Sequence, residues 1–183
     1  MSVGERLYVV VEPEFDPASL AALQAIRRRY DPQVVLIGPH VTLLFAARAE
    51  LGANLSDGLR RLAHQISPFA AAFGETQLHA SARDGAHYLY LLPKPAAAER
   101  LKVLFTRIQT MLPTSAVDHF ERFVPHITLG RFADRPTALR AQAAVLPLAP
   151  CEGEIRDLRL LASTAGNIQE LVRLPLGSGG LPA

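Results

Sequence analysis

Apolar residues along the chain occur in short runs and at helical spacings, which predicts a mixture of strands and helices. The run Leu7–Val11 is rich in valine and is typical of a buried strand. The turns Arg83–Gly85 and Ala165–Asn167 each lie between two further runs, as in a hairpin. We predict the remaining strand segments at Val34–Ile37, His40–Phe45, Phe69–Leu78, His87–Leu92, Phe123–Phe132, Ile155–Ser163 and Ile168–Leu174.

Four segments carry apolar residues at intervals of three and four positions, the spacing of an amphipathic helix. Asp16 can cap the first of these helices and Pro17 suits its first turn. The other three are predicted over Leu55–Ile66, Ala96–Leu112 and Thr137–Leu146. Together these elements favour an α+β fold of two pseudo-symmetric lobes, in which two antiparallel sheets line a central cleft and helices lie outside.

A near-identical pentapeptide occurs twice, once in each half of the chain. Pro39–Leu43 has the sequence PHVTL and Pro125–Leu129 has PHITL, with the two histidines 126 − 40 = 86 positions apart. Each copy is followed by a predicted helix and then by predicted strands, so the element order also repeats. We therefore predict a single bilobal domain over residues 1–176, with two pseudo-repeated lobes, and a flexible tail over residues 177–183.

The two pentapeptides offer residue types suited to phosphodiester chemistry. Alternation along a strand places His40 and Thr42 on one face and likewise His126 and Thr128, with the apolar residues facing a core. One histidine can remove a proton while the other supplies one, because imidazole titrates near neutral pH. Threonine hydroxyls can donate to the phosphate oxygens. The pattern predicts paired acid–base catalysis that requires no metal.

The composition is compatible with this chemistry and limits the ligands, the cysteine-based sites and the cellular location to be expected. The chain has 49% hydrophobic residues, a net charge of +2 and a pI of about 9.0, so a phosphate-bearing ligand is permitted. Cys151 is the single cysteine, which excludes an intramolecular disulfide and a cysteine-based zinc motif. We see no signal-peptide pattern and no apolar stretch of the roughly 18 residues that a membrane span needs, and we expect a cytoplasmic monomer.

At this point the chain resembles the two-histidine (2H) phosphoesterase superfamily, in particular its 2′-5′ RNA ligase-like branch. The resemblance is carried by Arg6–Val11, His40–Phe45, His126–Arg131 and Leu158–Leu176. It implies hydrolysis of 2′,3′-cyclic phosphates on RNA ends or nucleotides, and in some members reversible 2′-5′ joining of RNA without ATP. It also implies that no cofactor is needed. On matching motif positions, His40 and His126 become the catalytic pair, and Thr42 and Thr128 hold the phosphate.

Three further residues are candidate substrate contacts, each with an alternative. Arg131 stands where relatives often carry arginine, but strict alternation puts it opposite His126 unless Gly130 allows a bulge. Phe45 stands where relatives are commonly aromatic, and we interpret it as core in preference to a base-stacking platform. Tyr8 contacts a ligand if the first strand lines the cleft, and otherwise belongs to the core.

Other functions are consistent with the same sequence. A nucleotide- or RNA-binding module without catalysis could keep the fold, and a phosphodiesterase could act on a small cyclic metabolite. A metal site using both motif histidines and a third one lacks close-spaced ligands. Among the remaining candidates, His79 could stand at a cleft rim, His119 could lie near the substrate, and Arg27–Arg29 suit a solvated helix end.

Overall fold

The computed structural model describes residues 5–48, 51–112, 123–146, 148–164 and 166–177. The helices are α1 (Pro17–Tyr30), α2 (Gly52–His64), α3 (Pro95–Gln109) and α4 (Arg135–Val145). The strands are β1 (Arg6–Val11), β2 (Glu14–Phe15), β3 (Val41–Arg48), β4 (Phe69–Ala80), β5 (His87–Pro93), β6 (Ile127–Phe132), β7 (Cys151–Ile155), β8 (Asp157–Thr164) and β9 (Asn167–Pro175). His119 and the predicted tail from residue 178 onward lie outside the described residues.

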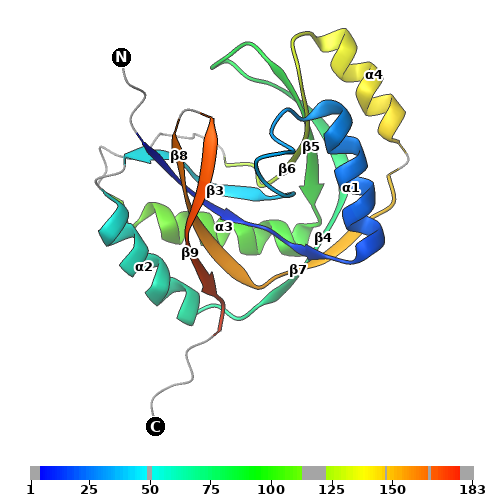
Figure 1. Cartoon of the computed structure of the whole chain (residues 1–183). Coiled ribbons are helices and arrows are strands. Elements are labelled where there is room, and N and C mark those ends of the chain that lie inside the picture. Colours follow the sequence, from blue (N-terminus) through cyan, green and yellow to red (C-terminus); the bar gives the residue numbers. More distant parts are fainter. Residues whose placement is uncertain (1–4, 49–50, 113–122, 147, 165, 178–183) are drawn as a thin grey trace.

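The described strands form one curled antiparallel sheet in the order β2-β7-β4-β5-β6-β3-β1-β8-β9 (Figure 1). The two strands that follow the motif histidines, β3 and β6, are neighbours near its centre and pair at Val41 and Ile127. This pairing joins the two halves of the sheet. One half ends at β6 and the other begins at β3. The predicted α+β fold is confirmed, and the two expected sheets are continuous with each other through this pair.

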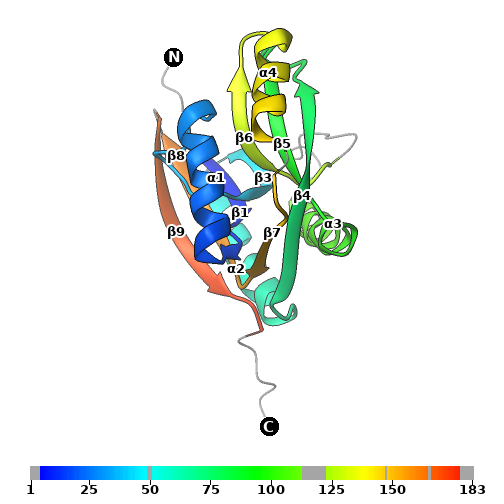
Figure 2. The ribbon, with the colours of Figure 1, turned by 90° about the vertical axis from the view of Figure 1, so that its right-hand side faces the viewer.

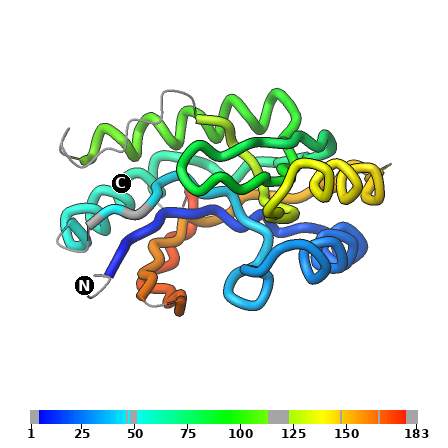
Figure 3. Tube along the Cα trace, turned by 90° about the horizontal axis from the view of Figure 1, so that it is seen from above, coloured from blue at the N-terminus to red at the C-terminus, as the bar shows by residue number. Residues whose placement is uncertain are grey.

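Each half of the sheet contains strands from both halves of the chain. The β4–β5 hairpin follows the first motif in sequence but pairs with β6, the strand of the second motif. Strand β8 follows the second motif but pairs with β1, beside β3. Helix α1 likewise packs on β6, whereas α3 packs on β3, β4 and β5. Figures 2 and 3 show these two helices on opposite sides of the strands. The two repeats are therefore interleaved.

The core lies under the helices and includes the apolar residues of both motifs. Val41, Leu43, Ile127 and Leu129 are fully buried, as alternation along the strands predicts. Burial of these side chains holds each motif strand in one register, because a slip of one residue would expose all of them. At Gly130 an added Cβ would lie 2.7 Å from Tyr30 Cβ, so only glycine lets α1 approach β6 this closely.

Helix starts agree with the capping signals in the sequence. Asp16 Oδ1 accepts hydrogen bonds from the backbone N–H groups of Ala18 (2.9 Å) and Ser19 (3.0 Å), and Pro17 follows in the first turn. Asp134 caps α4 in the same manner through Thr137 N–H at 2.8 Å. The first capping prediction is confirmed.

One predicted strand is wrong and two strands escape prediction. Val34–Ile37 forms turns, in which the N–H groups of Leu36 and Ile37 both donate to the Gln33 carbonyl at 2.9 and 3.3 Å. The segment thus satisfies its backbone locally. The sequence does not predict β7 because Glu152–Glu154 interrupt its apolar pattern, and β2 is only two residues long.

Candidate active site

The two motif histidines meet because β3 and β6 are adjacent antiparallel strands. Val41 pairs with Ile127, so the same register places His40 across from Thr128 and Thr42 across from His126. All four side chains are half-buried and lie on the face opposite the core, since their chain neighbours Val41 and Ile127 face inward. The arrangement is a two-by-two set in which each histidine stands beside the other motif's threonine.

Both imidazoles are oriented by the same local hydrogen bond. His40 Nδ1 lies 2.9 Å from the Gly38 carbonyl oxygen, and His126 Nδ1 lies 2.7 Å from the Val124 carbonyl oxygen. A carbonyl can only accept, so Nδ1 carries the proton in each ring and Nε2 remains for chemistry. Pro39 and Pro125 lie between donor and acceptor and restrict the backbone there. The repeat in sequence thus becomes a repeat in side-chain orientation.

Burial lowers the pKa of both histidines although part of each residue remains accessible. The pKa of His126 falls from 6.5 to about 4, chiefly because its surroundings disfavour the charged ring, and the charges of His40 and His79 lower it further. Burial also lowers the pKa of His40, where the Gly38 carbonyl opposes the shift. The two histidines precede adjacent strands, which accounts for the effect of the His40 charge on the pKa of His126.

A β-bulge follows each motif at its leucine. On β3, Thr42 pairs with Val10 and Leu44 with Val9, so Leu43 is an extra residue. On β6, Thr128 pairs with Tyr90 and Gly130 with Leu89, which makes Leu129 the extra residue. A bulge of one residue exchanges the faces of the positions that follow it.

The bulge places Arg131 on the same face as His126. Without it, strict alternation would place Arg131 on the opposite face. Arg131 pairs with Tyr88, and its Nε donates to Tyr88 Oη at 3.1 Å. Its Nη2 forms an ion pair with Asp84 Oδ2 at 3.0 Å. These two bonds fix Arg131 on this face. Hydrogen bonds from Ser81, Tyr88 and Arg131 lower the pKa of Asp84 well below its usual range.

Phe45 and Tyr8 also lie on the site face. Leu44 is buried in the core, so Phe45 follows on the side of His40 and is half-buried. On β1, the core positions Leu7 and Val9 flank Tyr8, which therefore faces the other way. Tyr8 pairs with Leu161 of β8, which lines a cavity of about 240 Å³ together with Gly38. The cavity borders Gly38, whose carbonyl accepts the hydrogen bond from His40 Nδ1.

Tyr90 is a site residue that sequence reasoning misses. Its ring stacks on His126 with centroids 3.5 Å apart and an interplanar angle of 19°. His79 stacks on the same tyrosine at 5.3 Å, so His79 lies at the rim of the site. The alternation of Tyr88 and Tyr90 along His87–Leu92 was a usable signal, but it does not show that β5 lies beside β6. In the other half, Val10 pairs with Thr42 where Tyr90 pairs with Thr128, so a valine occupies the strand position equivalent to Tyr90.

The described residues also bear on metal and membrane binding. Within the described parts of the chain, no three or more His, Cys, Asp or Glu side chains gather in a way that could hold a metal ion. None of the helices described has the length and apolar character needed to span a bilayer.

Comparison with known proteins agrees with the fold and identifies the family. The family model described as the 2′-5′ RNA ligase superfamily matches residues 15–167. A Bacillus cereus (strain B4264) protein named "Putative phosphoesterase" is 28% identical over 108 residues, which are 58% of this chain and 59% of that protein. The match therefore spans less than two thirds of this relative.

Solved structures share the fold over nearly the whole chain. E. coli LigT in its apo form superposes with a TM-score of 0.61 at 19% identity, covering 94% of this chain and 97% of LigT. TT0787 of Thermus thermophilus gives 0.61 at 21% identity, covering 94% and 98%. Usb1 of Kluyveromyces marxianus gives 0.60 at 16% identity, covering 96% and 99%. On the evidence of the family match, which covers most of its length, the chain belongs to the 2′-5′ RNA ligase superfamily of two-histidine phosphoesterases.

Proposed function

We propose that this protein is a metal-independent phosphoesterase that opens 2′,3′-cyclic phosphodiesters on RNA ends or nucleotides to 2′-phosphates. The observation that carries the proposal is the matched pair of imidazoles. Both come from one chain, both bind a backbone carbonyl through Nδ1, and both leave Nε2 available on the same face. Since both histidines belong to one chain, a monomer suffices. Reversible 2′-5′ joining would use the same groups in the opposite direction.

The chemistry needs one neutral and one protonated imidazole. The neutral ring removes a proton from water, whose oxygen attacks phosphorus while the bond to O3′ breaks. The protonated ring gives its proton to O3′, and the phosphate remains on O2′. Thr42 and Thr128 would donate to the non-bridging oxygens, where negative charge grows in the transition state. Among relatives, E. coli LigT forms complexes with 3′-AMP and with phosphate, which supports a nucleotide phosphate as the ligand.

The electrostatics favour different roles for the two rings. Positive charge on His40 and on His79 lowers the pKa of His126, whereas Arg27 and Asp31 act on His40 with opposite signs. Asp31 favours a proton on His40, and no carboxylate among the described residues has this effect on His126. We assign His40 as the acid and His126 as the base for ring opening.

We expect kcat/KM to be highest on the acidic side of neutrality. Because burial lowers the pKa of His40 from 6.5, the acid loses its proton at a pH below 6.5. The base gains a proton as pH falls toward about 4, the pKa of His126. The pH profile of kcat/KM reports the pKa values of the free enzyme, so it should peak between these two values. A maximum on the alkaline side would contradict the assignment.

A folding control accompanies this profile. Lowered histidine pKa values mean that the unfolded state binds more protons, so stability is present above pH 6.5 and is lost as pH falls below it. Circular dichroism at each pH separates loss of fold from loss of catalysis.

The proposal is tested by incubating the protein with 2′,3′-cyclic AMP and with a short RNA carrying a 2′,3′-cyclic end, in excess EDTA. We expect opening to the 2′-phosphate at a rate that EDTA does not change, identified by ³¹P NMR or by mobility against 2′- and 3′-phosphate standards. Turnover abolished by EDTA and restored by a divalent metal would overturn the mechanism. Binding without turnover of either substrate would indicate a binding module or a phosphodiesterase for another cyclic metabolite.

A further inference from the structure

A buried ion pair at the end of α1 takes no part in the proposed mechanism. Arg27 and Asp31 are 1% and 5% exposed. Arg27 Nε and Nη2 both bind Asp31 Oδ2, at 2.9 and 2.8 Å. Desolvating such a pair offsets most of its attraction, so stability alone is weak grounds for its presence. The sequence-based interpretation of Arg27–Arg29 as a solvated helix end holds for Arg28 and Arg29, which are exposed, but is wrong for Arg27.

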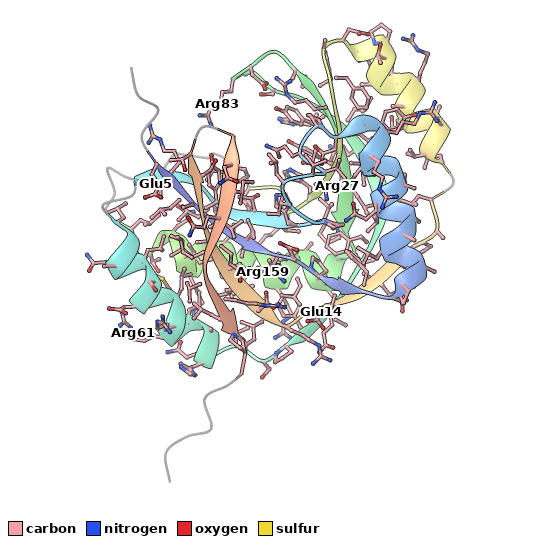
Figure 4. All side chains as sticks on the ribbon, viewed as in Figure 1. Glu5, Glu14, Arg27, Arg61, Arg83 and Arg159 are labelled. Carbon is pink, nitrogen blue, oxygen red and sulfur yellow. The ribbon has the colours of Figure 1, made fainter. Side chains whose placement is uncertain are left out.

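The pair is connected to His40 by consecutive hydrogen bonds. Arg27 Nη1 donates to the Ile37 carbonyl at 3.0 Å, across the turn segment that leads to β3. The next carbonyl in the chain, that of Gly38, accepts from His40 Nδ1 at 2.9 Å. Asp31 fixes the beginning of the same segment, since its Oδ1 accepts from Gln33 N–H at 2.9 Å. Figure 4 shows Arg27 on the side of α1 that faces this segment.

We infer that Arg27 and Asp31 are positioning residues for His40: they hold the turn that carries the Gly38 carbonyl and thereby set the orientation of the His40 ring. The inference rests on the proposed acid role of His40. A planar guanidinium suits this positioning role, because the group can bind a carboxylate and a backbone carbonyl at the same time in fixed directions. His126 makes the matching bond to the Val124 carbonyl, and its additional support is the Tyr90 ring. Two copies of one pentapeptide thus have different supports.

The charges around His40 determine in which direction each substitution should shift the pKa of His40. The groups that act on it are Arg27, which lowers its pKa, and Asp31, which raises it. His126, just before β6, stands opposite β3 and its own pKa is lowered by the His40 charge, and a Glu12 carboxylate oxygen would lie 2.8 Å from a Cβ added at Gly38. Arg27→Met leaves the Asp31 charge and should raise the pKa of His40. Asp31→Asn leaves the Arg27 charge and should lower it. General loosening of the fold would shift both variants in the same direction.

The experiment follows the His40 ring by NMR titration and measures kcat and KM on 2′,3′-cyclic AMP. We expect Arg27→Met to lower kcat by about 10- to 100-fold with KM nearly unchanged, because small misplacement of a catalytic group has effects of this size. Arg27→Lys keeps the positive charge but loses the planar guanidinium, so its kcat should lie between those of the unmodified protein and Arg27→Met. Arg28→Met, an exposed arginine one position away, is the matched control and should behave as the unmodified protein.

A double variant separates positioning from stability. Arg27→Met combined with Asp31→Leu removes both charges, which often restores or improves stability at such sites. We expect it to fold but to keep the low kcat, since the bond to the Ile37 carbonyl is still missing. A folded double variant with kcat within about twofold of the unmodified protein and an unshifted His40 titration would overturn the inference. If the unmodified protein does not turn over the substrate, the proposed function fails, while displacement of the His40 ring resonances in Arg27→Met but not in Arg28→Met, at a pH where the ring is neutral, still tests the positioning role.

Discussion

Replacing His40 or His126 with alanine is expected to slow opening of a 2′,3′-cyclic phosphate by at least ~100-fold in each case, the usual size of an acid–base contribution. Each variant loses one of the two Nε2 atoms that face the same side of the sheet. Ligand affinity should be largely kept, because Thr42 and Thr128 remain. The measurements are kcat on 2′,3′-cyclic AMP and the Kd of 3′-AMP by calorimetry.

The double variant is informative about how the two rings cooperate. If one ring takes a proton and the other gives one within a single step, removing the second costs little once the first is gone. We therefore expect the His40→Ala and His126→Ala double variant to be nearly as slow as the slower single variant. His64→Ala, in the last turn of α2 and exposed, is the matched histidine control. A single variant that keeps its rate within about tenfold would remove that histidine from the mechanism.

Much of this site was predictable because the motif repeats in a pattern that strands preserve. The alternation of His40, Val41 and Thr42 places the polar pair on one face whatever strand lies next to it. The same holds for the second motif, and the fully buried Val41 and Ile127 agree with it. The first helix could be placed because Asp16 and Pro17 are local signals, which depend on no distant contact.

The features that sequence reasoning missed depend on which strands become neighbours. Alternation along β6 assigns Arg131 to the wrong face, because the bulge at Leu129 appears only in the pairing with β5. The Tyr90 stack on His126 needs the same pairing. Arg27 belongs to a run of three arginines, and only its contact with the Ile37 carbonyl distinguishes it from its exposed neighbours. One sequence contains no direct record of such long-range contacts.

Removing the motif hydroxyls should also have a large effect, and its form should differ from that of the histidines. Thr42→Val and Thr128→Val keep the shape and strand preference of the side chain and delete only the donor. We expect each to lower kcat by about 10- to 100-fold, somewhat less than a donor in a fully dry site, because both threonines are partly exposed. Serine at either position should recover most of the loss.

The two threonines stand beside different histidines, Thr128 across from His40 and Thr42 across from His126. They would therefore stabilise charge on different phosphate oxygens, and their effects should multiply in the double variant, giving about a 10²- to 10⁴-fold loss. Wild-type kcat in the double variant would show that neither hydroxyl acts in the transition state. A raised KM with unchanged kcat would assign both to ground-state binding. Multiplying effects for the threonines beside non-multiplying effects for the histidines would distinguish two independent phosphate donors from one coupled proton relay.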